Sequence, residues 1–183
     1  DPRCRGWYHA AMLNQSEVIF TTPYIDASSG DVTITLARAV LVNDFMVGVV
    51  GADITLASLE ATVLSATVLD NGYTYMCDEQ KHLIVHPDLD YETDDTIYQV
   101  TAKEFSTTAE NEVADFEAFL DNHVLRGEVG QKSFTKNGEK WYVSYGPVNG
   151  TAYFLLMVVP DSDVTKPVDA LESDTDAAMT ILI

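Results

Sequence analysis

The sequence predicts an α+β protein made of two modules, each an antiparallel sheet flanked by helices. Short runs of β-branched and aromatic residues are joined by polar turns, which is typical of antiparallel hairpins. The spacing of apolar residues predicts helices over residues 6–15 and 109–125. A helix followed by a sheet therefore occurs twice along the chain, which indicates two related modules.

We place the first module at residues 1–66 and the second at residues 67–165, and a terminal segment follows at residues 166–183. This polar segment turns apolar over residues 177–183, which fits either a helix entering a membrane span or a terminus packed on the core. No apolar run reaches the roughly 20 residues needed to cross a bilayer, and no signal peptide heads the chain.

In the first module, we expect a short amphipathic helix over residues 6–15, followed by three antiparallel strands. The predicted strands are 18–26, 32–42 and 45–54, and the turns between them lie at 28–31 and 43–44. Within the second strand, apolar residues alternate with Thr33 and Thr35. This sheet would bring Tyr24, Asp26 and Asp53 into one neighbourhood.

In the second module, a helix over residues 56–65, capped by Thr55, leads from the first sheet across a linker at residues 67–72. A new sheet begins over residues 73–85, interrupted by a polar turn. The helix over residues 109–125 carries an apolar stripe that packs on this sheet: Val113, Phe116, Leu120 and Val124. Three strands joined by Asn-Gly turns then close the module at 132–135, 140–148 and 152–159.

Size and charge limit the kinds of partner. A chain of 183 residues with 46% hydrophobic content can bury genuine cores. Its formal charge of −19, from 29 acidic and 10 basic residues, repels phosphate backbones and anionic lipid headgroups. Nucleic-acid binding is therefore excluded as the expected function.

Metal and disulfide signals are weak. His82 and His86 point to one face of a strand, as metal ligands can, but no third ligand lies near them except the acidic run at residues 88–95. That run lacks the glycine and glutamate spacing of a calcium loop, so we expect a solvated loop, no metal and no cofactor. Cys4 and Cys77 are compatible with a disulfide or with two free buried thiols.

The first eight residues hold two arginines and two large aromatic side chains that later residues of the first module could complete as a pocket. A guanidinium binds a carboxylate through two parallel N–H bonds, whereas the carboxylate of Asp53 prefers an ammonium group. This set suits a ligand that carries both charges, such as a free amino acid. The alternative is structural, because Trp and Tyr often anchor cores and arginines form surface ion pairs.

Three blocks of the first module carry a resemblance to a known family: Asp-Pro-Arg-x-Arg-x-Trp-Tyr at 1–8, Thr-Pro-Tyr-Ile-Asp at 22–26 and Val-Gly-Val-Val-Gly-Ala-Asp-Ile-Thr-Leu at 47–56. With strands of the second module, they resemble the double Cache (dCache_1) extracytoplasmic sensor domains, in particular the amino-acid-binding subset. The resemblance covers about the whole chain and implies two PAS-like modules, of which the membrane-distal one binds ligand. It also implies that the distal module is N-terminally truncated, because the family has a long helix and a further tyrosine upstream of Arg5.

Position by position, the resemblance implies ligand-binding roles for Arg5, Trp7, Tyr8, Tyr24, Asp26 and Asp53. Arg5 would bind the ligand carboxylate, with the Trp7 indole N–H as a second donor. Asp53 would bind the ammonium group, assisted by the two tyrosine hydroxyls and by Asp26. Arg3 is expected to brace the turn at Pro2.

The function that follows is that of an extracellular or periplasmic sensor domain of a membrane receptor, which recognises a small molecule and has no catalytic activity. A biogenic amine is the nearest competing ligand, because aromatic faces attract ammonium groups. A protein-interaction or scaffold module of the same fold is a third interpretation. An enzyme would need a motif such as Gly-x-Ser-x-Gly or a phosphate loop, and the sequence has neither. A homodimer stays open.

Overall fold

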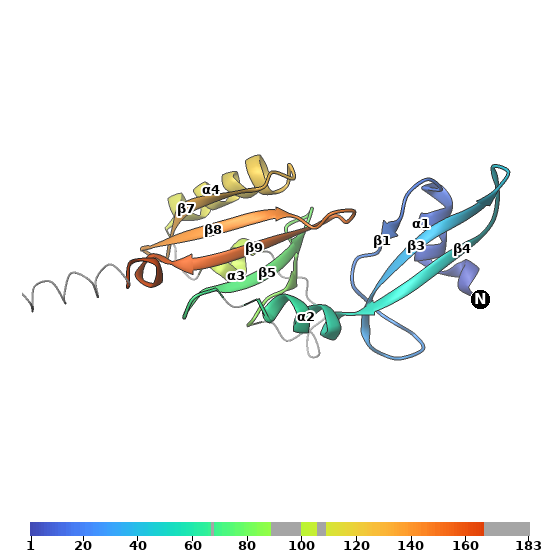
Figure 1. Ribbon diagram of the computed structural model, residues 1–183, viewed down its shortest axis with the longest axis horizontal. Helices are drawn as coiled ribbons and strands as arrows, with labels where there is room; N and C mark the ends of the chain where they lie inside the picture. The colour runs from blue at the N-terminus through green and yellow to red at the C-terminus, as the bar shows by residue number, and fades with distance from the viewer. Residues whose placement is uncertain (67, 89–99, 106–108, 167–183) are drawn as a thin grey trace, which may run out of the picture.

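The computed structural model of the protein describes residues 1–66, 68–88, 100–105 and 109–166. They form two modules arranged end to end along the longest axis of the molecule (Figure 1). Helix α2 (Leu56–Leu64) runs from the first module to the second. The predicted α+β class with antiparallel sheets is confirmed, and the boundary at residue 66 stays a prediction.

The first module is built around strand β3 (Val32–Val42), which pairs along one whole side with β4 (Phe45–Thr55). Two short strands, β1 (Ile19–Phe20) and β2 (Tyr24–Ile25), pair with different parts of the other side of β3. All of these pairs are antiparallel. Helix α1 (Gly6–Leu13) packs against β3 and β4, and its position confirms the helix predicted at residues 6–15.

The single strand predicted over residues 18–26 was wrong in its middle, where the chain leaves the ladder. Thr21 bonds Thr35 of β3 twice. Its backbone N–H donates to the Thr35 carbonyl at 3.1 Å, and its Oγ1 accepts from the Thr35 N–H at 2.9 Å. Pro23 follows and has no N–H with which to continue the pairing. The β-branched composition of this segment therefore yields β1 and β2 with a break between them.

The turn between β3 and β4 is the one predicted at residues 43–44. Asn43 and Asp44 have φ values of 50° and 63°, the left-handed backbone that a tight two-residue hairpin of this twist requires. The register then shifts at Val40 and Leu41, so that Val47 is the extra residue of a β-bulge.

The second module has a five-stranded antiparallel sheet in the order β6-β5-β9-β8-β7. Its strands are β5 (Tyr73–Asp78), β6 (Leu83–Val85), β7 (Gly130–Lys136), β8 (Glu139–Pro147) and β9 (Tyr153–Pro160). The short helix α3 (Val100–Glu104) and the longer α4 (Glu110–Phe119) accompany this sheet (Figure 1). The strands predicted from the Asn-Gly turns are confirmed, each with small changes at its ends.

The helix predicted at residues 109–125 is confirmed, although its last part is wider than an α-helix. Helix α4 continues into η2, a π-helical turn over Leu120–Val124. Phe116, Leu120 and Val124 are fully buried, as the apolar stripe requires. Gly127 follows with φ of 73°, a conformation that ends helices and favours glycine.

A buried apolar cluster joins the two modules. It contains residues from the first sheet, from α2 and from the second sheet: Ile34, Leu56, Val63, Met76, Ile84, Val85 and Tyr153. The Tyr153 hydroxyl, which comes from β9, also donates a hydrogen bond to the Thr21 carbonyl at 2.8 Å. The modules are therefore connected by shared packing as well as by the chain.

The second module also buries a charged side chain, Glu104, whose carboxylate has no solvent exposure. Its Oε1 lies 2.8 Å from His86 Nε2, and its Oε2 lies 2.5 Å from Lys136 Nζ and accepts from the Tyr73 hydroxyl at 2.6 Å. His86 Nδ1 accepts from the Asp88 N–H, which leaves Nε2 as the donor toward Glu104. Every oxygen of the buried carboxylate is thus satisfied from within the module.

The loop before β5 is tied to the chain after β9. The Asp163 carboxylate accepts from the Asn71 backbone N–H at 2.5 Å and from its side-chain amide at 2.7 Å. Lys166 Nζ lies 2.9 Å from both Asp163 Oδ1 and Asp70 Oδ2. Burial would raise the pKa of Asp163, but the bonds from Lys166 and Asn71 lower it to about 2.

Both cysteines are free thiols, so neither alternative from the sequence holds in full. Cys77 is buried in the second core, where burial raises its pKa to about 12, whereas Cys4 is exposed. Apart from Lys166, the predicted terminal segment lies outside the described residues, as does most of the acidic run at residues 88–95. In the part of the chain that the structure describes, no helix is long and apolar enough to span a bilayer.

Replacement of Tyr153 by Phe tests the junction between the modules. The Thr21 carbonyl would lose its partner, and the free energy of unfolding should fall by about 1 kcal/mol, measured by urea denaturation. Tyr145→Phe is the matched control, because the Tyr145 hydroxyl has no hydrogen-bond partner among the described residues. Equal stability of both variants would contradict a bond that joins the modules.

Glu104→Gln tests the buried charge network. Lys136 would stay buried without its counter-charge, so we expect a loss of about 3–5 kcal/mol in unfolding free energy. Exposed Glu139, replaced by Gln, is the control.

The same network predicts a pH dependence. Burial alone would raise the Glu104 pKa, but His86 and Lys136 lower it below its ordinary value. A carboxylate with a lowered pKa stabilises the fold above the unfolded pKa of about 4.3 and loses this effect as the pH falls through the folded pKa. Urea denaturation between pH 3 and pH 7, roughly spanning this window, should show a steeper acid loss in the wild type than in Glu104→Gln. Parallel profiles would contradict the assignment.

Candidate ligand-binding site

The two arginines of the first block have different surroundings. Asp1 caps the short 3-10 helix η1 (Pro2–Cys4), and its Oδ2 lies 2.7 Å from Arg3 Nη2. Arg3 therefore braces the turn at Pro2, as the sequence predicts. Arg5 begins α1 through its backbone, while its exposed guanidinium forms no hydrogen bond or ion pair with a described residue. Arg3 therefore has a structural partner, whereas the Arg5 guanidinium is available to a ligand.

Trp7 and Tyr8 lie in the first turn of α1 and are half-buried. Their rings meet edge to face, with centroids 5.9 Å apart. A Cβ placed on Gly51 of β4 would lie 3.6 Å from Trp7 Cζ3 and 3.7 Å from Thr35 Cγ2. The Trp7 ring and the Thr35 side chain therefore lie on the same face of the sheet, and the glycine leaves room for the ring to approach it.

A chain of hydroxyl groups connects two of the predicted site residues. The Tyr24 hydroxyl lies 2.6 Å from Thr35 Oγ1, and Thr35 Oγ1 donates to Asp53 Oδ1 at 2.6 Å. The strand registers explain this geometry, because Thr35 pairs with Asp53 and its neighbour Thr33 pairs with Tyr24. All three side chains extend from the face against which α1 packs.

Asp26 lies just beyond β2, and its carboxylate is engaged in the turn that follows. Its Oδ2 accepts from the backbone N–H groups of Ser28 and Ser29 at 3.1 and 2.9 Å, and also from the Ser28 hydroxyl. These bonds, with that of the Ser28 side chain the largest, lower the Asp26 pKa to about 2. The bonds that place Asp26 are therefore those of a turn, and its predicted role toward a ligand stays a prediction.

The structure brings Trp7, Tyr8, Tyr24 and Asp53 to one face through Thr35 and Gly51, and leaves the Arg5 guanidinium exposed at the start of the helix on that face. Such an arrangement offers a permanent cation, a carboxylate and aromatic surface. The chemistry of these groups suits a small molecule with two opposite charges. Sequence reasoning missed Thr35, which is 1% exposed, because a threonine in an alternating strand carries no signal of a buried polar role.

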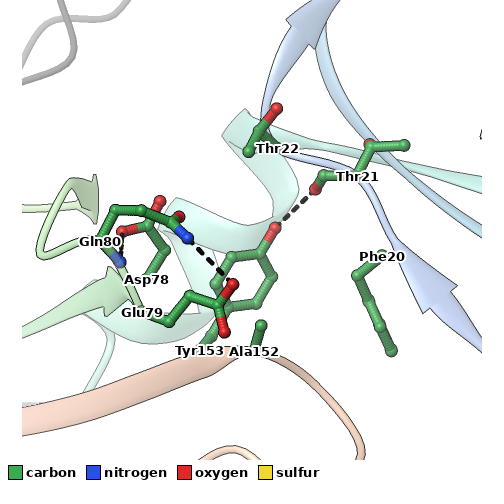
Figure 2. A pocket seen from close by; sticks show the side chains of 8 residues that line it. All are labelled: Phe20, Thr21, Thr22, Asp78, Glu79, Gln80, Ala152 and Tyr153. Atoms are coloured by element: carbon green, nitrogen blue, oxygen red, sulfur yellow. Dashed lines mark hydrogen bonds between the residues drawn. The ribbon is translucent and has the colours of Figure 1, made fainter. Parts of the chain in front are cut away.

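A separate recess lies at the junction of the modules (Figure 2). Its lining comes from both modules: Phe20, Thr21, Thr22, Asp78, Glu79, Gln80, Ala152 and Tyr153. The polar groups there bond one another, since Tyr153 donates to Thr21 and Asp78 accepts from the Gln80 N–H (Figure 2). No arginine or lysine is among these residues, so the recess offers no cationic partner for a ligand carboxylate.

The histidines considered as metal ligands have other partners. His82 Nδ1 lies 3.1 Å from the Asp78 carboxylate, and His86 belongs to the buried Glu104 network. Among the described residues, no group of three His, Cys, Asp or Glu side chains is placed to hold a metal ion.

An α+β domain of two linked antiparallel modules, with an open charged site on the module farther from the chain's exit, has the architecture of a sensor domain. The dCache_1 family model, described as Cache domain, matches residues 1–168. The chain belongs to this family, whose members are extracytoplasmic sensor domains of membrane proteins, and the resemblance predicted from the sequence is confirmed.

Similar proteins include methyl-accepting chemotaxis receptors. Methyl-accepting chemotaxis protein PscA of Pseudomonas syringae pv. tomato is 32% identical over 170 residues, which are 92% of this chain and 26% of that protein. The chain thus spans about a quarter of the length of this relative.

Two solved structures of ligand-binding domains resemble the fold. The domain of Mlp24 with asparagine has a TM-score of 0.56 at 26% identity and covers 92% of this chain and 61% of its own. The domain of Pseudomonas fluorescens chemoreceptor CtaA in complex with L-leucine has a TM-score of 0.55 at 26% identity and covers 88% and 61%.

The turn that holds Asp26 gives a direct test of its surroundings. In Ser28→Ala the carboxylate loses its largest stabilising bond, so its pKa should rise from about 2 toward the ordinary value of about 3.9. Side-chain carboxyl NMR against pH measures this shift. Ser29→Ala keeps the backbone N–H and should shift the pKa less. An unchanged pKa in Ser28→Ala would show that Asp26 is not held by the turn.

Proposed function

We propose that this chain is the ligand-sensing domain of a chemotaxis-type receptor and that its first module binds a free α-amino acid. The observation that carries this proposal is the pair of opposite charges left available in one small module. Arg5 has no partner among the described residues, and Asp53 is oriented by a hydroxyl rather than neutralised by a cation. An unneutralised carboxylate beside an aromatic wall favours a cationic ligand group.

The two charges divide the ligand between them. The guanidinium of Arg5 binds the ligand carboxylate, with the indole N–H of Trp7 as a second donor. Asp53 binds the ammonium group together with the Tyr24 and Tyr8 hydroxyls. Asp26, whose Oδ2 is bonded by the turn after β2, accepts a further N–H of the ligand through Oδ1. The ligand side chain then lies toward the rings of Trp7 and Tyr8.

Relatives support an amino acid as the ligand class. Two domains that share 26% identity with this chain were solved with asparagine and with L-leucine, which have the same α-amino and α-carboxylate groups and different side chains. Recognition of the shared groups is what a fixed cation and a fixed carboxylate provide. The rings of Trp7 and Tyr8 then determine which ligand side chains this domain prefers.

Binding is coupled to signalling through a shift of population, and no chemical step is required. A ligand that contacts α1 and β4 together favours the arrangement in which they are closest. A hundredfold preference for that arrangement is about 2.7 kcal/mol, enough to reverse a modest imbalance between two states. We propose that the domain has no catalytic activity and that its output belongs to the remainder of a longer receptor.

The test is a thermal-shift screen of the domain against the twenty common amino acids, propionate and simple biogenic amines, followed by calorimetry. An amino acid at about a hundred times its Kd should add about 2.7 kcal/mol of stability. Arg5→Ala and Asp53→Asn should each weaken binding at least about tenfold, which is 1.4 kcal/mol.

The chain supplies matched controls. Arg3→Ala removes a guanidinium two residues away that pairs with Asp1, and Asp44→Asn removes a carboxylate at the far hairpin turn. Both should leave the affinity unchanged. Wild-type affinity in Arg5→Ala and Asp53→Asn would overturn the residue assignment. Stabilisation by amines alone would remove Arg5 as an anchor, and no response to the panel would favour a scaffold module.

A further inference from the structure

The Thr35 side chain occupies the centre of the first sheet. It is 1% exposed, and its oxygen lies 2.6 Å from both the Tyr24 hydroxyl and Asp53 Oδ1. Its backbone N–H is also satisfied, because it donates to Thr21 Oγ1. Backbone pairing therefore fixes this residue on the strand, and its hydroxyl is left to connect the two predicted ligand contacts.

The protons in the hydrogen bonds that link Tyr24, Thr35 and Asp53 can be assigned one by one. An ionised carboxylate only accepts, so the single hydroxyl proton of Thr35 goes to Asp53 Oδ1. Thr35 then has no proton left for Tyr24, and the Tyr24 hydroxyl must donate to Thr35 Oγ1. The hydroxyl protons of Tyr24 and Thr35 therefore both point in the direction of Asp53 along this series of hydrogen bonds.

What remains for a ligand is a set of lone pairs. Tyr24 Oη has given its proton to Thr35, and Asp53 Oδ2 has no hydrogen-bond partner among the described residues. Neither group can donate a hydrogen bond outward while the chain is intact. Tyr24 and Asp53 therefore present acceptors only, and a group that offers several N–H donors matches them.

Building on the proposed amino-acid function, we propose that Thr35 is a positioning residue that makes this end of the site select a primary ammonium group. A primary ammonium offers three N–H donors to the lone pairs of Tyr24 and Asp53. A trimethylammonium group has the same charge and no donor, and it would leave both acceptors unpaired. Sites built to bond a donor reject analogues that lack it because of such unpaired groups.

The test compares L-alanine and L-asparagine with N,N,N-trimethyl-L-alanine by calorimetry. The wild type should bind at least one of the two amino acids, and at least about tenfold more tightly than the trimethylated analogue, a difference of 1.4 kcal/mol. Thr35→Val keeps the shape and removes the hydroxyl, which frees Asp53 to turn and Tyr24 to donate outward. It should weaken amino-acid binding about tenfold and reduce the discrimination. Thr35→Ser should restore both.

Thr33→Val is the matched control, because Thr33 lies on the same strand and face and is similarly buried. Among the described residues, its hydroxyl bonds only the Asp31 carbonyl. It should bind and discriminate as the wild type does. If Thr35→Val does not fold, Tyr24→Phe carries the test, since it removes one acceptor and leaves Thr35 in place. Its discrimination should also fall.

The outcomes separate this inference from the function on which it rests. If the wild type binds none of the twenty amino acids of the thermal-shift screen, the proposed function fails and the inference fails with it. If it binds another of them but neither L-alanine nor L-asparagine, that amino acid and its N,N,N-trimethyl derivative take their place in the comparison. If the wild type binds and Thr35→Val matches it in affinity and in discrimination, the inference alone is overturned. Equal loss in Thr35→Val and Thr33→Val would also overturn it, because a general weakening of the strand would then explain the effect.

Discussion

The apolar cluster between the two sheets is the constraint on which the rest of the structure depends. Leu56 and Val63 of α2 pack between Ile34 of the first sheet and Met76 of the second. Full burial of such side chains stabilises the fold by about 1.5–3 kcal/mol each, so the modules cannot separate without a large cost. Asp53 lies three residues before Leu56, and a ligand on that carboxylate is therefore close in the chain to the packing that joins the modules.

The two modules treat charge in opposite ways, because the second buries a carboxylate whereas Arg5 and Asp53 of the first are exposed. In the second, the Glu104 carboxylate is paired with Lys136 and bonded by His86 and Tyr73, so its charge is neutralised internally. In the first, the Arg5 guanidinium has no protein partner among the described residues. A buried charge that loses its partner destabilises a fold strongly, whereas an exposed charge without a protein partner is free to meet a ligand. This contrast fits the proposed function, in which the first module binds the ligand and the second is internally satisfied.

Sequence patterns predicted the strands and turns well where local chemistry decides them, as at the Asn43–Asp44 hairpin and at the Asn137–Gly138 turn between β7 and β8. They failed where distant contacts decide. The break after β1 depends on the bonds between Thr21 and Thr35, which are 14 residues apart, and the burial of Glu104 depends on side chains from several elements. The six site residues came from a family pattern, and that pattern held no sign of Thr35, whose role arises only from strand register.

The second module receives the chain at the start of β5 and releases it at the end of β9, and these two points are neighbours because Tyr73 pairs with Val158. A force that pulled these two points apart would act across the strands and break the hydrogen bonds between β5 and β9 one after another, beginning near Tyr73 and Val158. The bonds from Asn71 to Asp163 lie at that end of the β5–β9 pair, just before β5 begins and just after β9 ends. A force that pulls residue 71 away from residue 163 therefore loads this carboxylate before it loads the sheet.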